Sequence, residues 1–182
     1  MLAWWRKARV KGLVIGGLAV ALLGRARTTR DVDAIVFVDE EHWISFLRAG
    51  QTFSFLPRLP TALEFARTNR VLLLHHQRSD TDVDLSIGSL EFEKKALGRA
   101  HNVRVGRLSV PVATVEDLIV LKAVANRPQD WTDIEALLEG SDSIDEDYVR
   151  EHVDEFASLL EQPMIYQHLD SILRRQKRRR RK

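Results

Sequence analysis

Acidic residues at alternating positions in two β-like segments are the clearest candidates for chemistry in this sequence. Asp31-x-Asp33 opens one apolar, β-branched segment, and Asp82-Val83-Asp84 opens another. Side chains alternate along a strand, so each pair of carboxylates shares one face. If the two strands are neighbours, three or four carboxylates converge, and such oxygen ligands suit Mg²⁺. A pair of metal ions held there could stabilise the attacking and leaving oxygens of a phosphoryl or nucleotidyl transfer.

A double glycine, Gly16-Gly17, lies between a short apolar strand-like segment and a helix-like segment. A strand that ends in glycines at a helix N-terminus exposes backbone N–H groups and the positive end of the helix dipole, which favours phosphate. The surrounding residues match neither the dinucleotide-binding fingerprint nor the Walker loop. The alternative is a purely structural tight turn that needs small residues.

Hydrophobic periodicity and turn residues predict the elements that must position these side chains. Strands are expected over residues 13–15, 31–38, 71–77 and 83–87, with a hairpin between the last two and an extended segment over 103–112. Helices are expected over 18–23, 41–48, 61–67, 90–99, 114–126, 128–138, a segment capped by Ser143 and Glu146, and 165–173. Residues 53–60 are expected to form a loop. This order of mixed sheet followed by helices predicts an α+β fold with a helical C-terminal part.

The charge distribution separates the body of the chain from its C-terminus. The last nine of the 182 residues read RRQKRRRRK and carry eight positive charges, so the net charge of +2 leaves the other 173 residues at −6. We expect a core over residues 1–112, a helical part over 113–173 and a disordered basic tail over 174–182. Such a tail binds phosphate backbones in a salt-dependent way.

The composition excludes several classes of protein. The chain has no cysteine, which excludes disulfide frameworks, cysteine nucleophiles and thiolate zinc sites and fits a reducing, cytoplasmic compartment. The apolar run over residues 13–23 is too short to span a bilayer, and Arg25 and Arg27 stand where a signal peptide needs small residues. A buried strand followed by a helix explains this run better than an export signal, and no membrane partner is expected.

Taken in order, these segments resemble a known family, the nucleotidyltransferases of the DNA polymerase β-like superfamily, and especially the small bacterial AbiEii-type toxins and minimal nucleotidyltransferases. The resemblance spans about residues 13–138. It rests on VIGGLA at residues 14–19, Gly24, Arg27-x-Thr29-x-Asp31-x-Asp33, DLSIG at 84–88, EDLI-x-x-Lys at 116–122, and Arg127-Pro128-x-Asp130-x-x-Asp133-Ile134.

The resemblance implies a role for each matching residue. Asp31, Asp33 and Asp84 would bind Mg²⁺, with two ions expected, and Asp84 would also act as the base near the attacking hydroxyl. A nucleoside triphosphate would be held by Gly16 and Gly17, with Arg27 and Thr29 supporting that loop. Lys122 would approach the phosphates, and Asp130 would orient Lys122 or the substrate.

The residues themselves leave alternatives open. Asp82 competes with Asp84 as the third carboxylate, and Lys122 could be a surface lysine whose stem alone is buried. Asp130 could simply offset the dipole of its helix, and Asp133 could pair with Arg127 or an N-terminal basic residue. His75 and His76 alternate on a strand and are expected to be structural, and Trp4, Trp5, Trp43 and Trp131 are expected to pack in the interior.

The sequence therefore predicts a metal-dependent transferase that moves a nucleoside monophosphate from a nucleoside triphosphate to an acceptor hydroxyl. The toxin-like resemblance implies RNA, such as the acceptor end of tRNA, as the acceptor and an antitoxin as a partner. One alternative acceptor is a protein side chain or a small molecule such as an aminoglycoside. Another alternative is a non-catalytic protein that binds nucleic acid through its basic tail.

Overall fold

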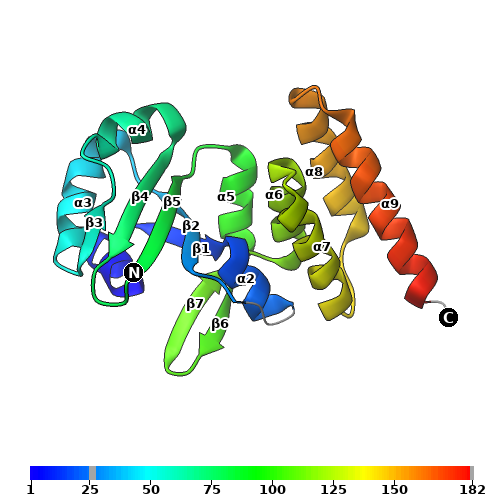
Figure 1. Ribbon diagram of the computed structural model, residues 1–182, viewed down its shortest axis with the longest axis horizontal. Helices are drawn as coiled ribbons and strands as arrows, with labels where there is room; N and C mark the ends of the chain where they lie inside the picture. Colours follow the sequence, from blue (N-terminus) through cyan, green and yellow to red (C-terminus); the bar gives the residue numbers. More distant parts are fainter. Residues whose placement is uncertain (25–27, 181–182) are drawn as a thin grey trace. The chain divides into compact units, whose positions relative to one another are not determined.

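The computed structural model describes residues 1–24 and 28–180, and Figure 1 shows the arrangement of its elements. Its strands are β1 (Lys11–Ile15), β2 (Asp31–Phe37), β3 (Phe55–Pro57), β4 (Val71–His76), β5 (Thr81–Ile87), β6 (His101–Val105) and β7 (Leu108–Val112). Its helices are α1 (Leu2–Ala8), α2 (Gly16–Leu23), α3 (Trp43–Gln51), α4 (Ala62–Asn69), α5 (Glu91–Arg99), α6 (Val115–Ala125), α7 (Pro128–Gly140), α8 (Glu146–Leu159) and α9 (Pro163–Arg180). A 3₁₀ turn, η1 (Glu40–His42), precedes α3.

The chain divides into two compact units. Unit 1 comprises residues 1–18 and 28–113 and contains the strands, whereas unit 2 comprises residues 19–27 and 114–182 and contains α6 to α9. The domain boundaries expected at residues 112 and 173 stay a prediction. Within the described ranges, no helix has both the length and the apolar character that crossing a membrane requires.

The strands of unit 1 form one mixed sheet in the order β3-β4-β5-β2-β1-β7-β6. Strand β2 lies near its centre, antiparallel to β1 and parallel to β5, and β5 is antiparallel to β4 as the predicted hairpin requires. Most of the β-branched and apolar side chains of β2 and β5 are buried. The predicted α+β fold with a mixed sheet and a helical C-terminal part is confirmed.

Aromatic residues hold the N-terminal helix in the core of unit 1. Trp4 is fully buried, stacks on Phe46 and Phe55 at ring-centroid distances of 4.3 and 5.1 Å, and donates a hydrogen bond to the Phe46 carbonyl. Trp5 and Trp43 are also buried in this core, and Trp131 is buried in unit 2. The expectation that these tryptophans pack in the interior is confirmed.

Two helix starts in unit 2 test the capping predictions. Thr114 accepts a hydrogen bond from the Asp117 backbone at 3.1 Å and caps α6 as expected. The cap predicted at Ser143 is wrong, because Asp145 caps α8 instead by accepting from the Tyr148 backbone at 3.0 Å. An aspartate is as good a cap as a serine, so residue type alone did not favour Ser143 over Asp145.

Two segments that were predicted to be extended or irregular contain more regular structure than expected. The segment 103–112 is a hairpin rather than one extended run, because Gly106 adopts a φ of +58° and turns β6 back onto β7. The expected loop over 53–60 contains β3, a short edge strand paired with β4. Pro57 ends that strand, where a missing backbone donor is tolerated.

The basic C-terminus is helical up to Arg180, so the predicted disordered tail is wrong for residues 174–180. Arg174 pairs with Asp170 of the same helix, while Arg175 and Arg179 pair with Glu135 and Glu139 of α7. These acidic partners reduce the repulsion between neighbouring arginines, which the local sequence alone cannot show.

Candidate active site

The carboxylates predicted to converge are brought together by the pairing of β2 with β5. The two strands are parallel and in register, so Asp33 lies opposite Asp84 and Asp31 lies opposite Asp82. Residues opposite each other in a parallel pair point to the same face of the sheet. Two acidic segments some fifty positions apart in sequence thus present their carboxylates on one face of neighbouring strands.

The diglycine bend lies directly beside Asp33. Gly16 follows β1, adopts a φ of +64°, and begins α2, whose second residue is Gly17. A β-carbon placed on Gly16 would lie 1.9 Å from the Asp33 Oδ2 atom and 2.6 Å from its β-carbon. Both the backbone conformation and the space therefore require glycine at this position. The bend places the N-terminus of α2 next to a carboxylate predicted to bind metal.

Thr29 donates a hydrogen bond to Asp31, the first carboxylate of the Asp31-x-Asp33 pair. Its hydroxyl donates to the Asp31 Oδ1 atom at 2.8 Å and also lies 3.2 Å from the Asp31 backbone oxygen. In this structure Thr29 thus orients a predicted metal ligand, a role different from the expected support of the glycine loop. Arg27, the other residue expected to support that loop, lies outside the described residues.

Two basic side chains that we did not predict lie among these carboxylates. Arg58 donates to the Asp82 Oδ2 atom at 2.9 Å through Nη1 and to the Asp84 Oδ1 atom through Nη2. The His75 Nδ1 atom shares a 2.9 Å hydrogen bond with the Asp82 Oδ1 atom. His75 is thus a neighbour of the carboxylate cluster, and its expected structural role stays a prediction. The register of the β4–β5 hairpin, which pairs His75 with Asp82, was the signal that could have found it.

A cavity of about 340 Å³ opens over this cluster in unit 1. Its lining is mostly charged and consists of Arg30, Asp31, Arg58, His75, Asp80, Asp82 and Asp84. The carboxylates on its wall and the two arginines give the cavity groups that suit a cation and an anionic ligand together.

The pKa values of Asp82 and Asp84, the two aspartates of β5, shift in opposite directions because their surroundings differ. Burial raises the pKa of Asp84, the charges of Asp31 and Asp82 raise it further, and Arg58 offsets only part of this effect. The hydrogen bond from His75 instead lowers the pKa of Asp82. A carboxylate with a raised pKa is the better proton acceptor, so Asp84 is better suited than Asp82 to act as a base.

The donor set fits Mg²⁺ in its chemistry, because the aspartates on this face offer only oxygen ligands. In the part of the chain that the structure describes, however, no three acidic or imidazole side chains gather closely enough to hold a metal ion. The Asp84 Oδ1 atom contacts Arg58 and the Asp31 Oδ1 atom accepts from Thr29. A divalent ion bound by Asp31, Asp33 and Asp84 would therefore either share the Asp84 carboxylate with Arg58 or displace Arg58 from it.

The two predicted residues of the late helical motif lie in unit 2. The Lys122 side chain is 7% exposed, so the alternative of a surface lysine is wrong. Its Nζ atom lies 3.1 Å from the Asp130 Oδ1 atom and 2.7 Å from the Asp133 Oδ2 atom. Lys122 therefore links α6 to α7 through ion pairs, and Asp133 has a partner that we did not expect.

Asp130 receives hydrogen bonds from two cations. The Arg127 Nε atom donates to its Oδ2 atom at 2.7 Å, in addition to the contact from Lys122. Burial raises the pKa of Asp130, but the hydrogen bonds from Arg127 and Lys122 outweigh it and the pKa is lowered. The lowered pKa favours the ionised form of Asp130, which contacts Lys122; that Asp130 orients Lys122 or the substrate stays a prediction.

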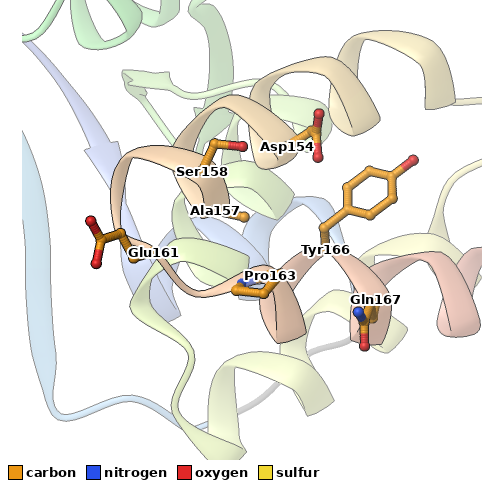
Figure 2. Close-up of a pocket in the computed structure, with 7 residues that line it drawn as sticks. All are labelled: Asp154, Ala157, Ser158, Glu161, Pro163, Tyr166 and Gln167. Carbon is orange, nitrogen blue, oxygen red and sulfur yellow. The ribbon is translucent and has the colours of Figure 1, made fainter.

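A second hollow, of about 350 Å³, lies between α8 and α9 within unit 2 (Figure 2). It contains none of the predicted site residues, and its lining residues are Asp154, Ala157, Ser158, Glu161, Pro163, Tyr166 and Gln167. By contrast, two of the predicted site residues, Asp31 and Asp84, line the cavity in unit 1.

Comparisons with known proteins identify the family and the fold. The profile of a family described as "Nucleotidyltransferase of unknown function (DUF6036)" matches residues 5–178. No curated protein matches the chain in sequence.

Solved structures share the fold over nearly the whole chain. The antibiotic-resistance factor ANT(2'')-Ia is similar with a TM-score of 0.63 and 15% identity, covering 92% of both chains. The lincosamide antibiotic adenylyltransferase LnuA has a TM-score of 0.54 and 13% identity, covering 77% of this chain and 93% of its own. A nucleotidyltransferase-like protein from Paracoccidioides brasiliensis has a TM-score of 0.53 and 14% identity, covering 91% and 87%.

Proposed function

Because the chain belongs to the DUF6036 family of nucleotidyltransferases, we propose that it transfers a nucleoside monophosphate from a Mg²⁺-bound nucleoside triphosphate to a hydroxyl group. The observation that carries this proposal is the in-register pairing of Asp33 with Asp84 beside the Gly16 bend. Asp31, Asp33 and Asp84 are the proposed metal ligands. When bound, Mg²⁺ would neutralise charge on the triphosphate and its leaving group.

The chain's own residues supply orientation and proton transfer. The acceptor oxygen attacks the α-phosphorus, a new P–O bond forms, and the bond to the β-phosphate oxygen breaks with release of pyrophosphate. Asp84 accepts the hydroxyl proton, a role supported by its position opposite Asp33 and on the wall of the cavity. Gly16 and Gly17 hold the triphosphate at the start of α2, where the helix dipole favours anions. Such catalysis rests on positioning and charge stabilisation.

The proposal is tested by label transfer. The wild type is incubated with each nucleoside triphosphate labelled at the α-phosphate, Mg²⁺, and total RNA, a protein extract or a panel of hydroxyl-rich small molecules. We expect one acceptor class to be labelled, and the Asp31→Asn/Asp33→Asn variant to label it about a thousandfold more slowly or not at all.

The matched control is Asp145→Asn/Asp147→Asn, which neutralises another Asp-x-Asp pair at the start of α8 and should label normally. Equal labelling by the wild type and by the Asp31/Asp33 variant would rule out these metal ligands. RNA binding without any labelling would favour the non-catalytic alternative.

RNA is the acceptor that we propose, as in the AbiEii-type toxins that the sequence resembles, with an antitoxin as the expected partner. Support comes from the basic face of α9, where Arg174, Arg175, Arg178 and Arg179 line a hollow of about 450 Å³. A small-molecule acceptor is the second candidate. The observation in its favour is that the lincomycin-bound adenylyltransferase LnuA and ANT(2'')-Ia in complex with adenylyl-2''-tobramycin share the fold over most of this chain.

Replacing basic residues of α9 by neutral ones distinguishes an RNA acceptor from a small-molecule acceptor. Among the described residues, Lys177 and Arg178 have no ion pair, whereas Arg175 and Arg179 pair with α7. Replacing Lys177 and Arg178 by glutamine should weaken RNA binding and reduce the slope of log affinity against log salt by about 1.4, at about 0.7 for each phosphate contact to a single strand.

The same change should leave nucleotide affinity as in the wild type. Filter binding at several salt concentrations measures the slope, and Arg175→Gln/Arg179→Gln serves as the control of equal charge. An unchanged slope in both variants would remove α9 from RNA binding and favour the small-molecule acceptor.

A further inference from the structure

Arg58 has a backbone position that is well defined by the sheet. It follows the edge strand β3, and its backbone N–H donates to the Leu73 carbonyl of β4 at 2.9 Å. Leu73 lies directly opposite Asp84 in the β4–β5 pair. The Arg58 backbone therefore lies two strands away from Asp84, with β4 between them, and the order of the strands fixes the distance that its side chain must span.

The guanidinium bridges two carboxylates rather than clamping one. One terminal nitrogen contacts Asp82 and the other contacts Asp84, while Arg58 is 29% exposed on the wall of the cavity. Repulsion among Asp31, Asp82 and Asp84 makes a positive charge favourable at this point. Arg58 thus supplies within the chain the kind of charge that a divalent cation would supply.

We infer that Arg58 is an internal counter-cation: it holds Asp84 until a divalent cation arrives, competes with that cation for the Asp84 carboxylate, and then contacts the triphosphate. This inference rests on the proposed function. The contact between Arg58 and Asp82 keeps the displaced guanidinium at the cavity wall. A planar guanidinium fork matches phosphate oxygens in geometry and charge, so the released group is suited to the triphosphate.

The competition is tested by Mn²⁺ binding to the full chain without nucleotide, measured from the electron paramagnetic resonance signal of free Mn²⁺. We expect Arg58→Ala to bind Mn²⁺ about fivefold more tightly than the wild type, since the ion no longer has to break a partly exposed ion pair. Arg58→Lys keeps the charge but not the fork, and should lie between them.

Arg30→Ala is the matched control. Arg30 lines the same cavity and carries the same charge, but within the described ranges it has no ion pair. Its loss should tighten Mn²⁺ binding less than the loss of Arg58. Unchanged or weaker binding in Arg58→Ala, or equal tightening in Arg30→Ala, would overturn the competition.

The second half of the inference is tested with a non-hydrolysable nucleoside triphosphate at saturating Mg²⁺. Isothermal titration calorimetry should show about tenfold weaker nucleotide binding to Arg58→Ala, and a smaller loss in Arg58→Lys. Nucleotide affinity equal to that of the wild type would overturn the phosphate contact. Circular dichroism checks that each variant is folded. If Arg58→Ala is not folded, the comparison is made between Arg58→Lys and the wild type.

An Asp33→Asn variant separates this inference from the function on which it depends. Mn²⁺ binding that is present, lost in Asp33→Asn and insensitive to Arg58 would overturn the inference alone. Wild-type Mn²⁺ binding that is absent or independent of Asp33 would overturn the proposed metal site and the inference together.

Discussion

Replacing Gly16 by alanine is expected to reduce nucleotidyl transfer at least a hundredfold and to destabilise the fold by about 2–4 kcal/mol. The added methyl group would lie 1.9 Å from the Asp33 Oδ2 atom, so either the bend or the carboxylate must move. The φ of +64° at Gly16 adds a conformational cost for any residue with a β-carbon. A metal ligand displaced by about an ångström no longer positions the reacting phosphate.

Label transfer gives the rate, and urea unfolding gives the free energy of unfolding. Gly98→Ala is the matched control, because Gly98 lies in α5 with no atom within 4 Å of an added β-carbon. That substitution should stabilise the protein by about 0.5–1 kcal/mol and leave transfer unchanged. Near-normal transfer by Gly16→Ala would show that the bend does not control the position of Asp33.

Lys122→Ala is expected to lower the free energy of unfolding by about 3–5 kcal/mol. The substitution leaves Asp133, whose side chain is 4% exposed, without the contact from Lys122, and removes one of the cations beside Asp130. A buried carboxylate that loses a partner keeps its desolvation cost and loses the compensating attraction. The contacts of Asp130 with Arg127 favour the lower end of this range.

Urea unfolding of the full chain measures the effect. Lys94→Ala removes an exposed lysine that pairs with Glu91 at 3.5 Å, and should cost about 1 kcal/mol or less. Combining Lys122→Met with Asp133→Asn should recover part of the loss, because the buried charge is removed together with its partner. A slower transfer rate in Lys122→Ala with an unchanged unfolding midpoint would instead support direct contact with the phosphates.

That the two carboxylates of each acidic pair share a face could be predicted, because it depends on local patterns. Alternation places Asp31 with Asp33 and Asp82 with Asp84, and the apolar residues that follow each pair favour buried, neighbouring strands. The diglycine bend is likewise local, since only a residue without a β-carbon readily adopts its φ. The neighbouring positions of Asp33 and Asp84 on one face then follow from the register.

Arg58 could not be predicted, because its role depends on three strands meeting in a particular order. The local sequence around it, with two prolines nearby, indicates only a loop. The β3-β4-β5 order is what places Arg58 within reach of Asp82 and Asp84. The helical C-terminus escaped prediction for the same reason, since the acids that pair with Arg175 and Arg179 lie some forty residues earlier in α7.

The pairing of β1 with β7 has a consequence for synthesis of the chain on the ribosome. Val14 of β1 pairs with Val112 of β7, so the edge of β1 next to the glycine bend has no neighbour until nearly a hundred further residues have been made. At about 5–20 residues per second, translation leaves that edge open for roughly 5–20 seconds. An apolar strand with free backbone groups is a template for association between nascent chains. Slow translation, or a high concentration of nascent chains, should therefore favour aggregation through β1. This would happen before β7 has been made and the sheet is complete.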